Sequence, residues 1–376
     1  MPIERKLYKT IKARFFQGKA IIIVGPRQTG KTTLLKQLTA DERAEDVLFL
    51  NCDEPDVLHL LENATSTELK NMTGSKRIIL IDEAQRVGNI GITLKLMIDN
   101  MNGIQLVATG SSAFDLRNRL NESLTGRKFE YRLYPFSTSE LIDAGSPLEE
   151  KRMLERRLIY GMYPDVVNHP TDAATLLFEL NNSYLFKDVL AYKDIRRPEE
   201  LNKLLIALSL QVSREVSYNE LGRTIGMDKE TIERYLDLLE KVFVVFRLTS
   251  FSRNLRNELK KSRKIYFYDN GIRNALINNF QPLALRNDTG ALWENFVISE
   301  RKKYNEYNGI PTNTYFWRTF AQQEIDYIEE RNGNLYAFEC KWNENKRPKL
   351  PTSFADAYPN CEYQTVNQAN YLNYIT

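Results

Sequence analysis

The chain has 376 residues, a length that predicts two or three domains at roughly 150 residues each. Apolar residues make up 42% of the chain and charged residues 27%, which excludes an intrinsically disordered protein. The 52 basic and 49 acidic residues give a net charge of +3, which excludes a wholly basic nucleic-acid coat but leaves room for a local basic patch.

The few cysteines and histidines restrict the kinds of functional site that the chain can form. Three cysteines, Cys52, Cys340 and Cys361, are too widely spaced for a disulfide framework or a four-cysteine zinc site. Because His59 and His169 are also far apart in sequence, we expect any catalytic base to be a carboxylate. The N-terminus has no apolar core, and no segment approaches the ~20 apolar residues of a membrane helix. We therefore expect a cytoplasmic protein without a membrane partner.

The first third of the chain alternates short apolar runs with helix-length segments. A continuous β-branched run without polar alternation is typical of a strand covered on both faces. Strands are expected at Ala20–Val24, Val47–Leu50, Arg77–Ile81 and Gln105–Thr109, with a helix at Thr32–Leu38. This alternation predicts an α/β fold whose core, residues 1–140, is a parallel sheet.

The middle of the chain is predicted to be helical. Helices are expected at Met153–Tyr160, Ala173–Leu190, Leu201–Leu210, Tyr218–Ile225 and Lys229–Lys241, followed by a strand at Val242–Leu248. A turn at Gly226 gives the last two helices the spacing of a helix-turn-helix, and the order of elements is typical of a winged helix. We divide this part into a helical lid or linker at 141–195 and a winged helix at 196–265.

The last third, residues 266–376, has the pattern of a small α/β domain. An amphipathic helix is expected at Ala291–Lys303, and strands at Thr314–Arg318, Glu324–Glu330 and Leu335–Lys341. Asn332-Gly333 between the last two strands is a hairpin signal. The tail at 343–376, rich in Asn, Pro and Tyr, shows no pattern that assigns its elements.

A phosphate-binding loop follows the first predicted strand. The segment 25–32, GPRQTGKT, fits the pattern G-x-x-x-x-G-K-[ST] and opens a predicted helix. Backbone N–H groups of such a loop converge on phosphate oxygens, and the helix N-terminus adds positive potential. Lys31 would supply a full charge at the β/γ-phosphates and Thr32 a hydroxyl to Mg²⁺. The predicted nucleotide-binding residues are Gly25, Pro26, Arg27, Gln28, Thr29, Gly30, Lys31, Thr32, Thr33 and Ser111.

The third predicted strand ends in two carboxylates, as the companion of a phosphate loop should. Asp82 is expected to hold the Mg²⁺ shell together with Thr32. Glu83 is expected to orient and deprotonate the attacking water, which in-line phosphoryl transfer requires. The alternative for Glu83 is a surface salt bridge.

Two further polar groups are candidates for the same site. Ser111, in the TGSS segment after the fourth strand, can sense the γ-phosphate, although Ser111 or Ser112 would equally serve as a helix N-cap. Arg127 is a candidate arginine finger, acting within its own chain or on a neighbouring subunit of a homo-oligomer. A solvated or paired arginine is the alternative.

A set of segments spread along the chain resembles one known family. The resemblance is to bacterial and archaeal predicted ATPases of the AAA+/STAND-like class, which have a P-loop core, a helical segment, a winged helix and a restriction-endonuclease-like C-terminal domain. It implies ATP and Mg²⁺ as cofactors, with hydrolysis expected. The segments are GPRQTGKTT (25–33), LIDEAQRV (80–87), TGSSAFDL (109–116), SLTGR (123–127), LYPFSTSEL (133–141), YFYDNGIRN (266–274), GALWENFVISE (290–300), FWRTFAQQEIDYI (316–328) and FECKW (338–342).

A second candidate site lies in the last third. Asp326, Glu339 and Lys341 have the form D-x(12)-E-x-K, and hairpin pairing would bring them together. Two carboxylates can hold a Mg²⁺ that activates water, with Lys341 stabilising phosphate charge, as in PD-(D/E)xK nucleases. Glu294 on the preceding helix is a further candidate ligand. The alternative is a solvated ion pair, because E-x-K is common on strands.

The charges of the middle segment favour a protein contact for one part of it and a DNA contact for another. The predicted second helix of the helix-turn-helix carries more acids than bases, which is a poor surface for phosphates, so we expect it to pack against protein. The segment after it is basic and is the best candidate for a DNA backbone contact, with a solvated wing as the alternative. The residues concerned are Arg253, Arg256, Lys260, Lys261, Arg263 and Lys264.

Three functional hypotheses remain open at this stage. The first is a Mg²⁺-dependent ATPase whose nucleotide state rearranges the winged-helix and C-terminal domains. The second is an ATP-regulated DNA nuclease, and the third is a nucleotide switch that turns over slowly and recruits a protein partner.

Overall fold

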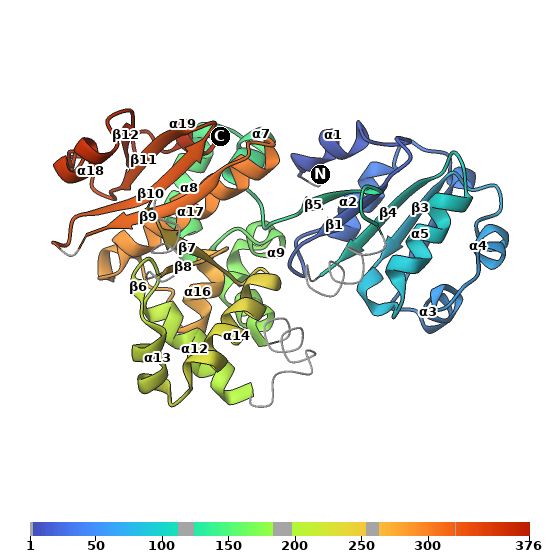
Figure 1. Ribbon diagram of the computed structural model, residues 1–376, viewed down its shortest axis with the longest axis horizontal. Helices are drawn as coiled ribbons and strands as arrows, with labels where there is room; N and C mark the ends of the chain where they lie inside the picture. The colour runs from blue at the N-terminus through green and yellow to red at the C-terminus, as the bar shows by residue number, and fades with distance from the viewer. Residues whose placement is uncertain (1–2, 112–123, 183–197, 253–262, 320) are drawn as a thin grey trace. The chain divides into compact units, whose positions relative to one another are not determined.

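The computed structural model divides the chain into two compact units (Figure 1). Unit 1 comprises Met1–Pro135 and Lys241–Phe243, and unit 2 comprises Phe136–Glu240 and Val244–Thr376. The structure describes residues 3–111, 124–182, 198–252, 263–319 and 321–376. Within these ranges no helix is both long and apolar enough to span a bilayer.

Unit 1 is built on a parallel sheet in the order β2-β3-β4-β1-β5. Its strands are β1 (Ala20–Val24), β2 (Val47–Asn51), β3 (Ile78–Asp82), β4 (Gln105–Gly110) and β5 (Lys128–Arg132). Every residue of β1, β3 and β4 is buried, as continuous apolar runs require. The parallel sheet and four of its strands were predicted correctly.

Helices cover the sheet of unit 1 (Figure 1). They are α1 (Leu7–Lys12), α2 (Lys31–Leu38), α3 (Pro55–Leu61), α4 (Ser66–Thr73) and α5 (Ile90–Asn100), with short 3-10 turns η1 (Ala44–Asp46) and η2 (Ala84–Arg86). The strand order places β4 between β1 and β3, so the loops after β1, β3 and β4 open at the same, carboxyl edge of the sheet. Ligands of open α/β sheets bind at this edge.

Unit 2 contains a mixed sheet in the order β12-β11-β10-β9-β7-β8-β6. Its strands are β6 (Glu215–Val216), β7 (Val245–Ser250), β8 (Arg263–Phe267), β9 (Asn313–Arg318), β10 (Glu324–Arg331), β11 (Asn334–Cys340) and β12 (Glu362–Val366). The hairpin between β10 and β11 forms at Asn332-Gly333 as predicted, because both residues adopt positive φ, 50° and 81°. Strands from 196–265 and from 266–376 therefore share one sheet, joined where β7 pairs with β9.

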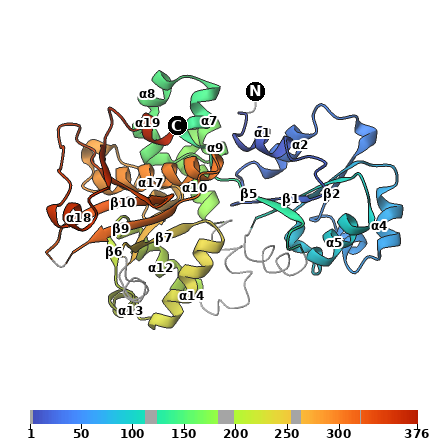
Figure 2. The same cartoon turned by 45° about the horizontal axis from the view of Figure 1, so that its top comes forward.

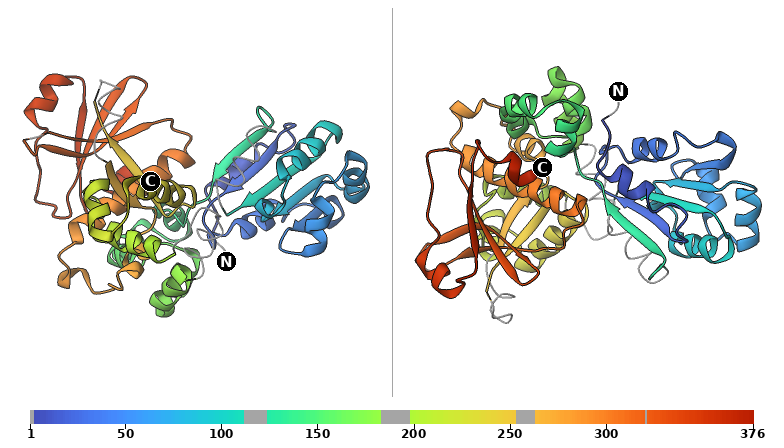
Figure 3. Two further views of the ribbon diagram at one scale, coloured as in Figure 1. Left: turned by 60° about the horizontal axis from the view of Figure 1, so that its bottom comes forward. Right: turned by 90° about the horizontal axis from the view of Figure 1, so that it is seen from above.

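The helices of unit 2 include each predicted one within the described residues. They are α7 (Thr138–Ala144), α8 (Pro147–Tyr160), α9 (Pro164–Asn168), α10 (Ala173–Leu180), α12 (Pro198–Leu210), α13 (Tyr218–Ile225), α14 (Lys229–Lys241), α16 (Asn270–Leu276), α17 (Thr289–Tyr307), α18 (Thr352–Ala357) and α19 (Leu372–Ile375), with η3 (Pro170–Asp172) and η5 (Leu283–Leu285). The end of the predicted helix Ala173–Leu190, from residue 183, lies outside the described residues. Helix α17 runs along one face of the sheet, in contact with β8 and β11 (Figures 2 and 3).

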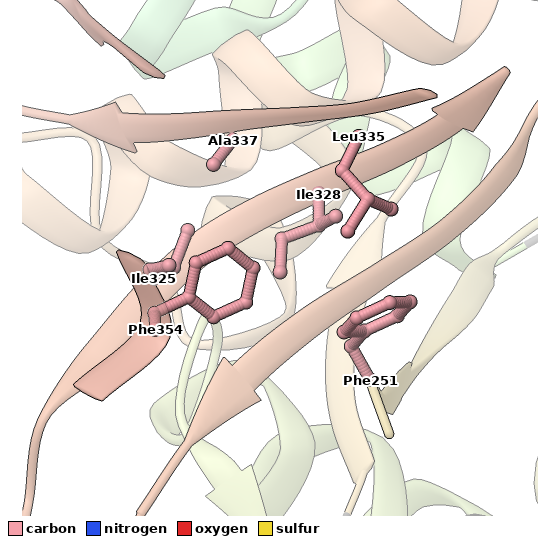
Figure 4. Close-up of a cluster of buried hydrophobic side chains, with 6 residues drawn as sticks. All are labelled: Phe251, Ile325, Ile328, Leu335, Ala337 and Phe354. Atoms are coloured by element: carbon pink, nitrogen blue, oxygen red, sulfur yellow. The ribbon is translucent and has the colours of Figure 1, made fainter. Parts of the chain in front are cut away.

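An apolar cluster that includes residues of β10 and β11 holds the C-terminal tail (Figure 4). The cluster consists of Phe251, Ile325, Ile328, Leu335, Ala337 and Phe354. Ile325 and Ile328 face the same core although they are three residues apart, because a bulge shifts the register between them. Phe354, which is fully buried, anchors α18 there and packs edge-on against Trp317 at 5.0 Å between ring centroids.

The segment YFYDNGIRN at 266–274 fixes α16 to the end of α8. Asp269 is buried and accepts hydrogen bonds from the backbone N–H groups of Met162 (2.7 Å), Gly271 (2.8 Å) and Ile272 (3.2 Å), so it caps α16. The Asn274 side-chain amide donates to the carbonyls at the end of α8, 3.1 Å from Leu158 O and 2.8 Å from Ile159 O. This part of the family resemblance therefore has a structural role.

Candidate functional site

The predicted phosphate loop connects β1 to α2 in unit 1. Gly30 caps α2 with a φ of 88°, and Gln28 also has a left-handed φ of 57°, so the loop makes the tight turn that its glycine pattern predicts. Thr29 Oγ1 donates to Pro26 O (2.8 Å) and closes the loop. At Gly25, an added Cβ would lie 2.0 Å from Leu133 O, so no larger residue fits without a backbone shift.

Lys31 lies over this loop and is buried. Its Nζ donates to Gly25 O at 3.0 Å and to Pro26 O at 2.8 Å. Thr32 and Thr33 follow at the exposed start of α2. Because the first turn of α2 leaves backbone N–H groups without intrahelical partners, the loop, the ammonium and the helix end together form an anion-binding surface.

Arg5 supports the loop from outside the recognised pattern. Its guanidinium is buried and donates to Thr29 O (2.5 Å) and to Tyr134 O (2.6 Å). It thereby ties the loop to the segment that follows β5. Sequence reasoning missed Arg5, since a single arginine near the N-terminus belongs to no motif.

Asp82 and Thr32 meet at the carboxyl edge of the sheet, as predicted for a magnesium site. Thr32 Oγ1 donates to Asp82 Oδ2 at 2.5 Å. The other carboxylate oxygen accepts a hydrogen bond from Thr109 Oγ1 at the end of β4. The start of α2 and the ends of β3 and β4 therefore supply one polar cluster, and a hydroxyl beside a carboxylate is a ligand pair that suits Mg²⁺.

Glu83 follows Asp82 in a strained conformation. Its φ is 53°, which a residue other than glycine rarely adopts, and its N–H donates to Thr109 Oγ1 at 3.2 Å. Gln85 Nε2 donates to Glu83 Oε2 at 2.5 Å and to Ser111 Oγ at 2.9 Å. The Gln85 amide thus joins the predicted base to the predicted γ-phosphate sensor. Gln85 was not recognised from the sequence, where it is one residue of the segment LIDEAQRV.

Arg127 lies at the opposite end of the sheet from the loop. In the parallel pairing of β5 with β1, Lys128 is opposite Ala20 and Arg132 is opposite Val24, whereas the loop follows Val24. At about 3.3 Å per residue, the five residues of β5 separate Arg127 from the loop by well over 10 Å. Its Nε pairs with Asp99 Oδ1 of α5 at 2.8 Å. The structure therefore does not bring Arg127 to the nucleotide loop of its own chain.

The predicted carboxylate pair in unit 2 does come together. Asp326 on β10 accepts a hydrogen bond from the Cys340 N–H at 2.9 Å, beside Glu339 on β11. Lys341 Nζ lies 2.6 Å from Glu339 Oε1 and 3.8 Å from Asp326 Oδ2. Burial and then the charge of Asp326 raise the pKa of Glu339 to about 7.

Lys264 enters the same cluster, which corrects the prediction that it contacts a DNA backbone. It is 1% exposed, and its Nζ lies 3.0 Å from Glu294 Oε1, 2.5 Å from Glu324 Oε1 and 3.7 Å from Asp326 Oδ1. A side chain enclosed in this way cannot reach a phosphate. Arg263 pairs with Glu233 of α14 at 3.3 Å. The other predicted DNA contacts, Arg253, Arg256, Lys260 and Lys261, lie outside the described residues.

Helix α14 packs against protein. Its apolar side is buried, with Ile232, Leu236 and Leu239 inaccessible to solvent. Its acids Asp237 and Glu240 both pair with Arg247 of β7. The acids of α14 are therefore engaged within the chain, and a separate protein partner for this helix stays a prediction.

Three parts of the chain match known families. Residues 17–142 match a family described as an AAA domain. Residues 151–283 match a domain of unknown function, DUF8612, and residues 289–374 match another, DUF4143.

Two relatives that match two thirds or more of this chain are uncharacterized proteins. A protein of Mycobacterium tuberculosis is 28% identical over 347 residues, which are 91% of this chain and 74% of the relative. A protein of Haemophilus influenzae is 26% identical over 272 residues, 67% of this chain and 68% of the relative.

Among solved structures, a Walker-type ATPase of Pyrococcus abyssi aligns with a TM-score of 0.50 and 14% identity, covering 73% of this chain and 96% of that chain. At this identity the similarity concerns the fold. Residues 17–142 thus match an AAA domain family, and the fold is similar to that of a Walker-type ATPase. The C-terminal part, residues 289–374, is similar to a domain family of unknown function.

Proposed function

We propose that unit 1 binds ATP with Mg²⁺ and hydrolyses it. The observation that carries the proposal is the direct hydrogen bond between Thr32 and Asp82 beside the loop that holds Lys31. Thr32 and Asp82 would hold the metal ion, which supplies positive charge to the phosphate oxygens. Lys31 would exchange its loop carbonyls for the β/γ-phosphate oxygens, which accept charge-assisted hydrogen bonds more strongly.

Glu83 would act as the base in this reaction. Its carboxylate extends from the same edge of the sheet as Asp82, and Gln85 holds it by one oxygen. The other oxygen would orient water and accept its proton. Through the bridge of Gln85 to Ser111, the position of Glu83 would depend on what contacts Ser111.

The test is Mg²⁺-dependent phosphate release by the purified chain. We expect turnover with ATP and Mg²⁺ and none with EDTA. Glu83→Gln should keep ATP binding but lower turnover roughly 100- to 10,000-fold, because the amide keeps the shape and loses the base. The control is Glu45→Gln, an acid that is 71% exposed and remote from the loop in sequence. Unchanged turnover in Glu83→Gln would assign the base to another residue.

The nucleotide state would be transmitted to unit 2 through the end of β5. Gly25 of the loop lies against Leu133, and the next residue, Tyr134, packs edge-on against Phe243 at 6.1 Å between ring centroids. Both segments continue directly into unit 2. A nucleotide that displaces the loop would therefore act on the two points where the chain leaves unit 1. We also propose that a partner molecule responds to this change. A cytoplasmic location is likewise a proposal.

Arg127 is proposed to act on a neighbouring subunit, since it lies far from the loop of its own chain. The ATPase rate per subunit should then rise with protein concentration, and Arg127→Ala should lower the rate about 1,000-fold. Arg43→Ala, at a position with a 71% exposed side chain, is the matched control. Rates measured over a dilution series give the answer. A rate that is independent of dilution, from a monomer, would exclude action between subunits.

A further inference from the structure

We propose that Lys264 is the resident cation of the carboxylate cluster in unit 2, and that its ammonium group takes the place of a divalent metal ion. The carboxylate cluster consists of Glu294, Glu324, Asp326 and Glu339. Carboxylates arranged on a hairpin beside a helix, as in PD-(D/E)xK nucleases, imply a bound divalent metal ion. The residues around these carboxylates do not fit a divalent metal ion.

The geometry around Lys264 is that of a bound cation. An ammonium group has three N–H donors, and oxygens of three carboxylates surround it. Glu294 reaches it from α17 at 3.0 Å, and Glu324 and Asp326 reach it from β10 at 2.5 and 3.7 Å. Only 2% of the Lys264 side chain is exposed, so these carboxylates and not water solvate it.

The charges of the cluster require this partner. A buried ammonium without counter-ions would lose its proton, and buried carboxylates without a cation repel one another. Burial lowers the pKa of Lys264, but Glu294, Asp326 and Glu324 outweigh it and hold that pKa above its ordinary value. Burial and then Asp326 raise the pKa of Glu294 to about 8. The Tyr266 hydroxyl donates to the same Glu294 oxygen at 2.7 Å.

The oxygens that a metal would need are already engaged. Asp326 uses one oxygen toward Lys264 and the other for the Cys340 N–H, while Glu339 Oε1 pairs with Lys341. Glu339 Oε2 is buried and has no hydrogen-bond partner in the part of the chain that the structure describes. In that part, no group of three or more His, Cys, Asp or Glu side chains is placed to hold a metal. A divalent ion at Asp326 would also be repelled by two ammonium groups within 4 Å of its carboxylate.

The test measures Mn²⁺ binding in a chain whose phosphate loop is disabled by Lys31→Ala. This single variant should bind no Mn²⁺ by electron paramagnetic resonance and should melt at the same temperature with and without the ion. The double variant Lys31→Ala with Lys264→Gln should melt lower without metal, because three carboxylates lose their cation. It should then bind one Mn²⁺ and gain about 5 °C or more at saturating ion.

Two controls make the result specific. Lys302→Gln in the Lys31→Ala background changes another lysine beside the sheet, one that pairs with Glu306 on α17, and should create no Mn²⁺ site. Adding Asp326→Asn to the double variant should remove the Mn²⁺ response.

The proposal is overturned if the Lys31→Ala chain binds one Mn²⁺ and Asp326→Asn abolishes that binding. This measurement decides even where Lys264→Gln fails to fold. The proposal is equally overturned if Lys264→Gln folds and melts like its parent without metal, since the cluster would then have no need of the ammonium group.

Discussion

Lys31→Ala should lower the affinity for ATP roughly 100-fold or more. Its Nζ is the charge that the fold places over the loop, 3.0 Å from Gly25 O and 2.8 Å from Pro26 O. Removing a charged partner of buried phosphates typically costs 2–5 kcal/mol, and each 1.4 kcal/mol is tenfold in affinity. Titration with a fluorescent ATP analogue measures the loss directly.

Lys36→Ala is the matched control for this experiment. Lys36 lies on the same helix, α2, and is exposed, so its removal changes the net charge equally and leaves the loop intact. Its ATP affinity should stay within about twofold of the parent, since an exposed charge beyond the first helical turn contributes little. Equal affinities in Lys31→Ala and in the parent would exclude the loop as the phosphate site.

Gly271→Ala should destabilise unit 2 by about 1–3 kcal/mol or more, which is the typical cost of forced overpacking. An added Cβ would lie 2.1 Å from Tyr160 O and 2.9 Å from Asp269 Oδ1. To relieve the overlap, α16 would have to move away from α8. That movement would break the hydrogen bonds of Asn274 and the cap made by Asp269. Thermal and urea unfolding report the change.

Gly290→Ala is the same glycine-to-alanine change, but we expect it to have the opposite effect on stability. Gly290 lies in the first turn of α17, and an added Cβ meets nothing within 4 Å. Alanine should there stabilise the chain by up to about 1 kcal/mol through helix propensity. If Gly271→Ala unfolds at the same urea concentration as Gly290→Ala, the close approach of α16 to α8 is not required.

The sequence was most informative where burial is uniform. Each of Ile21, Ile22 and Ile23 is fully or almost fully buried, so an unbroken apolar run indicated β1 directly. Strand β5 was missed because Lys128, Glu130 and Arg132 interrupt it. As the edge strand it needs only partial burial, and its alternating pattern gives a weaker signal. Elements β12 and α18 were missed because distant contacts such as those of Phe354 stabilise them, not local propensity.

In the candidate site, too, residues in a local sequence pattern were predicted, and residues that act through contacts of the fold were missed. The loop residues and Asp82 follow from one short pattern and one strand end, so spacing alone brought Thr32 and Asp82 together. Arg5 and Gln85 contribute through contacts that depend on the fold and have no motif. For Lys264, neighbouring basic residues in the sequence suggested a DNA backbone contact, with a solvated wing as the alternative. Strand β8 instead places its side chain among carboxylates of α17 and β10.

The assignment of Lys241–Phe243 to unit 1 has a consequence for dissecting the molecule. The chain passes between the units at 135/136, at 240/241 and again at 243/244. A fragment ending at Pro135 would lack Phe243 and would expose the face of Tyr134 that this ring covers. Neither unit can therefore be released intact by a single proteolytic cut, and an ATPase module could not be exchanged between relatives by one recombination event.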